Sequence, residues 1–127
     1  MALRRAVDPH ELRDAVAAVV PWLNGGPRPD RKALAAAVRL SLRTLELAAP
    51  GNSVEVRVPP FAAVQCVLGP RHTRGTPPNV VETDPQTWLE LVLGRLTWGE
   101  ALEDGRIDAS GTRADVSQWL PLVTLKH

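Results

Sequence analysis

The sequence DPQTWLELVLGRLTWGEALEDGRIDASGT, residues 84–112, contains the signals that order the C-terminal half of the chain. Asp84 and Pro85 are typical of a helix N-terminus, because a carboxylate caps exposed backbone N–H groups and proline is tolerated in the first turn. Thr97 and Glu100 have the spacing of a capping box, in which each side chain accepts a hydrogen bond from the other residue's backbone. The stretch therefore begins with two helices.

Glycines separate these helices from the elements that follow. Gly94 is placed to end the first helix and Gly105 to end the second, because glycine adopts the left-handed cap conformation without strain. Residues 106–110 then predict a short strand. Residues 111–115 have helix-capping spacing and predict a last helix, which Pro121 bends or shortens. The inner face of this last helix is formed by Val116, Trp119, Leu120 and Val123.

The N-terminal part of the chain predicts a helical hairpin. Asp8 is placed to cap a helix over residues 9–20, which Pro21 ends or kinks. After a turn rich in glycine and proline, Asp30 is placed to cap a longer helix that reaches residue 49. Apolar side chains recur at helical spacing in both segments, so each has one face suited to burial.

Three runs between the hairpin and residue 84 predict strands. Residues 53–58 alternate apolar and polar side chains, which is typical of a strand with one solvated face. Residues 61–68 are apolar on both faces except for Gln65, so we predict a central strand covered on both sides. Residues 80–83 form a third, short strand. The fold class expected is α+β, with a mixed sheet of about four or five strands covered by helices on one face.

The length of 127 residues fits one domain over residues 1–127. Within it we expect an N-terminal helical part, residues 1–50, and a part with the sheet and the C-terminal helices, residues 53–123. This size suffices for one hydrophobic core, because a chain of this length buries roughly two-thirds of its surface on folding.

Composition and charge limit the partners. The net charge is +1, with 15 basic and 14 acidic residues, which argues against nucleic acid as a partner. The preference for arginine over lysine is better explained by coding bias than by phosphate recognition. No segment approaches the ~20 apolar residues of a membrane span, so we expect no stable membrane insertion. Cys66 is the only cysteine, which excludes an intramolecular disulfide and suits a reducing cytoplasm.

The sequence offers little chemistry for catalysis. Its three histidines are isolated, so spacing assembles neither a nucleophile with a base nor a metal site. Cys66, flanked by apolar residues, is better explained as a small buried hydrophobe than as a nucleophile. We therefore expect no cofactor, no metal and no enzymatic activity.

The loop around Arg71 and Arg74 is the sharpest group of polar residues. Its two guanidinium groups, with His72 between them, suit a phosphate or carboxylate bound through forked charge-assisted hydrogen bonds. The alternative is a solvated turn whose arginines pair with Glu82 or Asp84. From these residues alone the solvated turn is the favoured interpretation.

Three tryptophans of the C-terminal half permit two interpretations. Trp88, Trp98 and Trp119 fall on predicted helices, and each buries roughly 150–250 Å² when covered. They either fill a closed core or line an apolar pocket between the sheet and the helices. Spacing alone favours the closed core.

The order of these features resembles the C-terminal half of sterol carrier protein type 2-like domains. The resemblance is carried by the helix with Trp88, then by GRL at residues 94–96, GRI at residues 105–107 and Gly111. The loop RHTRGTPPNVVETD, residues 71–84, is similar to the bacterial stand-alone branch of that family. The match covers roughly residues 53–123, and it implies a lipid tunnel between the sheet and the helices. Carried over by position, the tunnel lining would be Val64, Cys66, Trp88, Val92, Leu102, Trp119, Leu120 and Val123.

Two functions follow from this resemblance. The favoured hypothesis is non-catalytic binding of a lipid or hydrophobic carboxylate, such as a fatty acid, acyl-thioester or phospholipid. Its tail would lie against Trp88, Trp98 and Trp119, and its head group near Arg71 and Arg74. The alternative is an accessory or dimerisation domain without a lipid ligand, similar to modules fused to mycothiol-dependent isomerase-like enzymes. Such a domain would bind a protein partner or a second copy through the helical hairpin.

Overall fold

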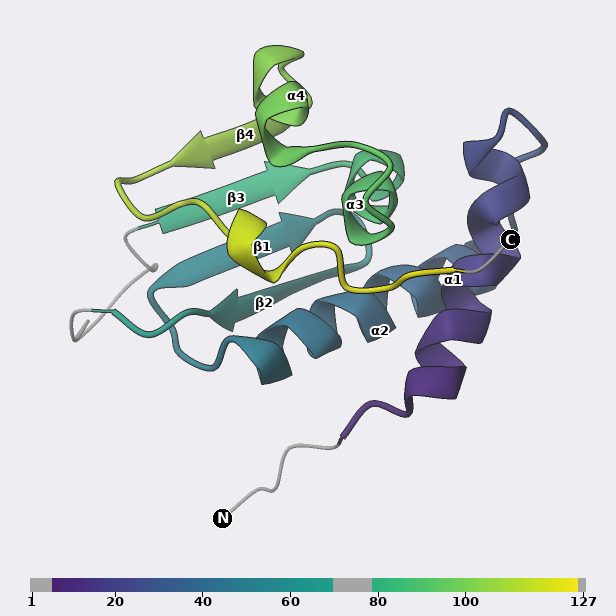
Figure 1. Cartoon of the computed structure of the whole chain (residues 1–127), viewed down its shortest axis with the longest axis horizontal. Coiled ribbons are helices and arrows are strands. Elements are labelled where there is room, and N and C mark those ends of the chain that lie inside the picture. The colour runs from purple at the N-terminus through teal and green to yellow at the C-terminus, as the bar shows by residue number, and fades with distance from the viewer. Residues whose placement is uncertain (1–5, 70–78, 126–127) are drawn as a thin grey trace.

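The computed structural model describes residues 6–69 and 79–125 of the chain (Figure 1). Its helices are α1 (Pro9–Leu23), α2 (Arg31–Ala48), α3 (Pro85–Val92) and α4 (Trp98–Glu103). Its strands are β1 (Val54–Val58), β2 (Ala62–Cys66), β3 (Asn79–Thr83) and β4 (Ile107–Ser110), and a 3-10 turn, η1 (Ser117–Trp119), follows β4. The α+β class and the N-terminal helical hairpin are confirmed.

The four strands form one mixed sheet in the order β2-β1-β3-β4. Strand β1 pairs parallel with β3, whereas β1 with β2 and β3 with β4 pair antiparallel. The parallel pair at the centre places the start of β1 beside the start of β3. Residues 69–79 of the sequence therefore connect the β2 edge to the centre of the sheet.

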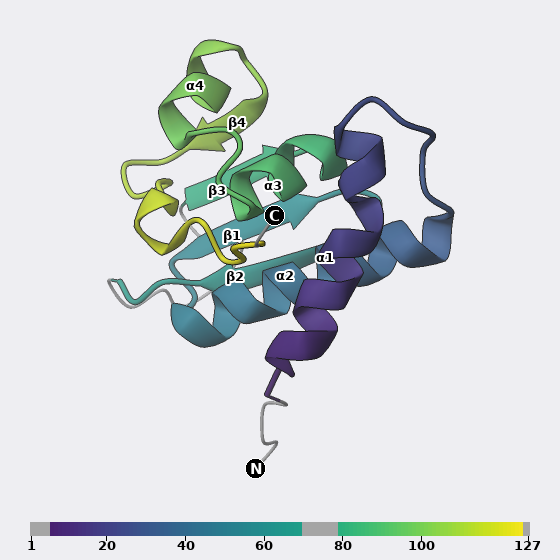
Figure 2. The same cartoon turned by 45° about the vertical axis from the view of Figure 1, so that its right-hand side comes forward.

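One face of this sheet is covered by helices and the other is open. Val54, Val56 and Val58 are fully buried, whereas Glu55 and Arg57 alternate with them on the opposite face and are half-buried. On the covered side α2 packs against β2 and α3, and α1 packs against α2 (Figure 2). The alternation predicted for this strand and the one-sided cover of the sheet are both confirmed.

The first helix runs three residues past its predicted end at residue 20, so Pro21 does not end it. Helix α1 continues through Pro21 to Leu23, where Asn24 caps it by donating its backbone N–H to Val20 O at 3.0 Å. Leu23 is buried, so its contact with the core stabilises the last turn. Proline removes only one backbone hydrogen bond, and that loss is offset by the packing that the extra turn provides.

Strand β2 lies at the edge of the sheet, so the prediction of a central strand was wrong. Its burial alternates, with Ala63 and Gln65 exposed on the open face and Cys66 buried. The prediction failed because Ala63, an apolar residue in the sequence pattern, lies on the solvated face. A methyl group buries so little surface that it is tolerated on a solvated face as readily as in a core.

The predicted last helix is also absent from the described residues, where only the single turn η1 forms. The side chain of Asp115 accepts a hydrogen bond from Ser117 N at 2.8 Å, which favours a local turn over a helix cap. Beyond the turn, Leu122 N and Val123 N both donate to Val92 O, at 2.9 and 3.1 Å. These bonds satisfy a carbonyl at the end of α3 and hold the chain extended, so a tertiary contact replaced local helix formation.

The signals in residues 84–112 are confirmed in detail. The Asp84 carboxylate accepts from Thr87 N at 2.8 Å and caps α3. Thr97 and Glu100 form both bonds of the predicted capping box, and the backbone N–H of Thr97 lowers the pKa of the Glu100 carboxyl. Gly94 and Gly105 have φ values of 74° and 69°, so both adopt the left-handed conformation that ends a helix.

Trp88 of α3 joins this helix to α2 inside the core. Its side chain is fully buried, and its indole Nε1–H donates to the hydroxyl of Ser41 on α2 at 2.9 Å. The Ser41 hydroxyl in turn bonds to the carbonyl of Ala37 at 2.7 Å. Because the buried indole N–H lies away from water, it depends on this serine as its acceptor.

We predict that Ser41→Ala lowers the free energy of unfolding by about 1–3 kcal/mol, because it leaves a buried indole N–H without an acceptor. Thr44→Ala is the matched control, since the Thr44 hydroxyl bonds to the carbonyl of Leu40 at 2.8 Å but accepts no indole. Urea unfolding of both variants checks the prediction. Equal losses in the two variants would contradict the role given to the Ser41–Trp88 bond.

Candidate functional site

Several residues of the predicted ligand-binding set lie inside the packed core. Trp88, Cys66 and Val92 have no exposed surface, and Val123 is buried beside them in the same core cluster. Val64 is half-buried on the helix-covered side of β2. No cleft found among the described residues is lined by any of these five side chains. A role for them in binding therefore requires a cavity that this conformation does not open.

Burial also sets the chemistry of the cysteine. It raises the pKa of the Cys66 thiol to about 11, with a smaller contribution from the negative charge of Glu46. The thiol is therefore protonated at neutral pH, and the thiolate is the form that reacts as a nucleophile or binds metal. Nothing in its surroundings favours the ionised form.

We predict that a thiol reagent at pH 8 modifies native Cys66 at least about 100-fold more slowly than the unfolded chain, because a pKa raised by two units lowers the thiolate fraction by that factor. A Gln65→Cys, Cys66→Ala variant is the control, since Gln65 is exposed on the same strand. Its modification should be fast in the native state. Comparable rates for native wild type and this control would show that Cys66 is accessible.

A first apolar cleft lies beneath α4. It has a volume of about 370 Å³ and contains Trp98 of α4 and Leu120, two residues of the predicted binding set. Its lining carries no charged side chain and consists of Leu91, Gly94, Leu96, Thr97, Trp98, Gly99, Ser117, Leu120 and Pro121. We call this the α4 cleft.

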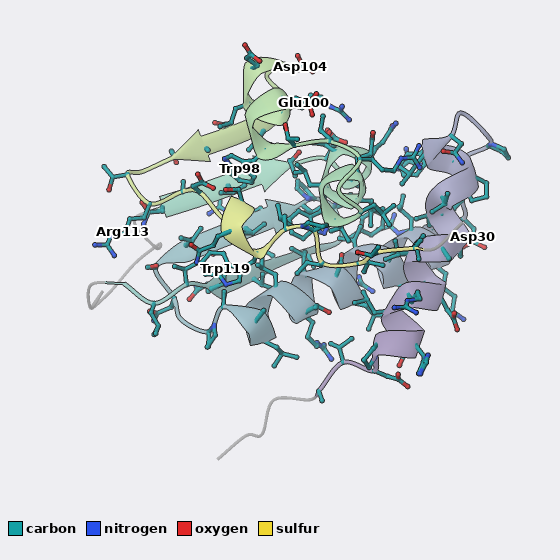
Figure 3. The ribbon with its side chains drawn as sticks, viewed as in Figure 1. Asp30, Trp98, Glu100, Asp104, Arg113 and Trp119 are labelled. Atoms are coloured by element: carbon teal, nitrogen blue, oxygen red, sulfur yellow. The ribbon has the colours of Figure 1, made fainter. Side chains whose placement is uncertain are left out.

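A second apolar cleft lies where β2 ends and contains Trp119, the third tryptophan of the predicted set. Its volume is about 300 Å³, and its lining consists of Ala48, Ala49, Pro50, Val67, Leu68, Gln118 and Trp119. We call this the β2-end cleft. Figure 3 shows Trp98 and Trp119 on opposite sides of the C-terminal turn, so residues 117–121 form the wall between the two clefts.

Backbone strain occurs beside the β2-end cleft. Val67 has φ 68°, which is rare for a β-branched residue, and its N–H donates to Ala49 O at 2.7 Å. Its carbonyl accepts from both the backbone N–H and the hydroxyl of Ser53, at 3.1 and 2.7 Å. A Cβ on Gly51 would lie 2.2 Å from that carbonyl oxygen, so only glycine fits there. These contacts hold Val67 in its strained conformation and direct the chain out of the sheet.

The remaining predicted residues are dispersed. Leu102 is 44% exposed on α4 and lines neither cleft. Arg71 and Arg74 lie outside the described residues, so the predicted head-group site stays a prediction. The structure thus divides the predicted lining among the core, two clefts and the surface.

Sequence reasoning missed two features of the described residues. The first is an apolar groove of about 570 Å³ on the helical hairpin, lined by Ala6, Val7, Pro9, Leu12, Thr44, Leu47 and Leu122. The second is Arg113, whose side chain lies against Gly69 at the β2-end side of the sheet. No local signal marks either feature, because both depend on where the C-terminal segment crosses the helices and the sheet.

The described part of the chain offers neither a cluster of metal ligands nor a membrane-spanning helix. Within residues 6–69 and 79–125, no three His, Cys, Asp or Glu side chains are grouped closely enough to hold a metal ion. No helix in these ranges has both the length and the apolar character needed to cross a bilayer.

Comparison with known proteins identifies a family for most of the chain. A family model described as a bacterial SCP ortholog matches residues 30–122, which run from the cap of α2 to the segment beyond η1. The match thus includes α2, the whole sheet and both clefts, whereas α1 precedes it. No curated protein matches the chain.

Proposed function

The chain belongs to the bacterial SCP ortholog family, a sterol carrier-type domain, and from this we propose that it is a non-catalytic carrier of a hydrophobic small molecule. The observation that carries the proposal is the pair of apolar clefts on either side of residues 117–121. Each contains one tryptophan from the predicted set, and both lie within the matched region.

The size of the clefts supports a lipid chain as cargo. Volumes of about 300 and 370 Å³ are at the lower end of the roughly 300–1,000 Å³ typical of ligand sites. Burying ~300 Å² of acyl chain at about 25 cal/mol per Å² gains several kcal/mol before entropy costs. Trp98 and Trp119 each contribute a flat apolar side chain to the lining of one cleft.

We predict that the purified protein binds oleate, and that a double variant Ala48→Phe, Gly99→Phe lowers the affinity at least about tenfold with Tm nearly unchanged. Ala48 is exposed and a Cβ on Gly99 meets nothing within 4 Å, so each ring fills one cleft without disturbing the core. Native mass spectrometry measures the complex, and thermal unfolding checks stability.

Gln65→Phe is the control for this experiment, because it adds the same ring to the exposed face of β2. It should leave oleate binding unchanged. Wild-type protein that stays free of lipid after incubation with oleate would refute the carrier function. Binding that persists in the double variant would place the cargo elsewhere.

The groove on the helical hairpin favours a second candidate function, contact with a second copy of the chain. This groove is larger than either cleft, and Thr44 is the one polar residue in its lining. The groove lies on the helical hairpin, through which the alternative hypothesis expects the domain to bind a partner or a second copy. Removing the helical hairpin would not test this candidate, because α2 supplies much of the hydrophobic core and its loss would unfold the domain.

We predict for this second candidate that wild type forms a dimer that Leu47→Glu converts to a monomer, because a carboxylate in the groove opposes apolar contact. Arg43→Glu is the control, since Arg43 is exposed on the same helix outside the groove. Size-exclusion chromatography with light scattering measures the mass. A wild-type monomer at all concentrations would exclude this candidate.

A further inference from the structure

Arg113 is held at the end of the sheet where β1 and β3 begin. Its backbone N–H donates to Oδ1 of Asn79 at 2.9 Å, and Nδ2 of Asn79 donates to Ser53 O at 2.8 Å. Because Asn79 is buried, these bonds fix the Arg113 backbone relative to two strands. Nη1 of Arg113 lies 3.5 Å from the position that a Cβ would take on Gly69. The guanidinium is therefore placed next to the residue that follows Leu68.

This guanidinium has no acidic partner among the described residues. The ion pairs formed there belong to Arg57 and Arg106, and Arg113 is in none of them. Residues 70–78, which continue from Gly69, contain no Asp or Glu in the sequence. A guanidinium is always charged and presents forked N–H donors that match a carboxylate or phosphate. Arg113 is exposed, so its guanidinium is accessible to an anion from outside the chain.

An exposed apolar surface adjoins this cation. Leu68 is 78% exposed, the most of any large apolar side chain described, and it lines the β2-end cleft with Trp119. The strained conformation of Val67 directs the chain toward this exposed position. Strain of this kind persists where surrounding contacts enforce it and is common at ligand sites. Figure 3 shows Arg113 and Trp119 at the same end of the sheet.

The other apolar surfaces differ in whether a charged side chain lines them. No charged side chain lines the α4 cleft or the groove on the helical hairpin. The cleft at residues 57–63 contains Arg57, but this arginine already pairs with Glu55. The lining of the β2-end cleft is also uncharged, but Arg113 lies beside that lining, against the Gly69 that follows Leu68.

We propose that the β2-end cleft binds a single-chain amphiphile with an anionic head, whose carboxylate or phosphate oxygens accept hydrogen bonds from Arg113. The chain would lie over Leu68 and Trp119. A volume of about 300 Å³ suits one acyl chain and is too small for the two chains of a phospholipid. This inference rests on the proposed carrier function and names the head group and the number of chains of its cargo.

The test compares three ligands with the same chain, dodecanoate, dodecyl phosphate and neutral dodecanol, by native mass spectrometry. Arg113→Ala should weaken binding of at least one anion about tenfold or more, and leave dodecanol within twofold. Arg113→Lys should restore part of the loss, because it keeps the charge without the fork. The anion whose affinity falls more in Arg113→Ala identifies the preferred head group.

Matched variants distinguish binding in the β2-end cleft from nonspecific binding to the protein surface. Leu68→Ser should weaken all three ligands, whereas Leu102→Ser, at an exposed leucine on α4, should weaken none. Arg13→Ala is the charge control, because Arg13 is exposed on α1. Anion binding that falls equally in Arg13→Ala and Arg113→Ala would overturn the inference while the carrier function stands. Wild-type protein that binds none of the three ligands would refute the carrier function itself.

Discussion

The burial of Trp88 between α3, α2 and the sheet is the constraint on which the rest of the structure depends. Its ring fills the centre of the core, and its N–H bonds to Ser41, so α3 is held against α2 in one orientation. That orientation places the end of α3 where Val92 O can accept two bonds from the C-terminal segment. A core contact thereby sets the path of residues 117–123 across the molecule, and both clefts follow from that path.

The C-terminal segment gives the domain its candidate binding surfaces. As a helix it would have placed Trp119, Leu120 and Val123 on one face. As an extended chain with a single turn it distributes these side chains. Val123 enters the core, Leu120 lines the α4 cleft and Trp119 lines the β2-end cleft. The apolar residues that suggested one cavity therefore form two shallow clefts separated by a wall one chain thick.

A second constraint acts just beyond the C-terminal end of α2, where Val67 N donates to Ala49 O. Gly51, Ser53 and Val67 form a tight crossing in which three hydrogen bonds hold a valine in the left-handed region. The cost of that conformation is of order 1–3 kcal/mol, so it persists only because its neighbours leave no alternative. Its result is an exposed Leu68 near the unpaired Arg113. Apolar and cationic groups thus meet at a place that no core contact requires.

Local signals in the sequence determined the ends of α3 and α4, the capping box and the alternation of β1, because each depends on residues within one turn or one strand. The family resemblance was also readable from the order of those signals, and the match over residues 30–122 confirms it. Only the tertiary structure decided that β2 lies at an edge, that residues 116–123 stay extended and that Arg113 lies beside the β2-end cleft. These outcomes depend on hydrogen bonds and packing between residues far apart in the chain, such as Val92 with Leu122 and Asn79 with Arg113. Spacing along a sequence carries no information about such pairs, so it predicted the elements that local residues determine but not the last segment or the clefts beside it.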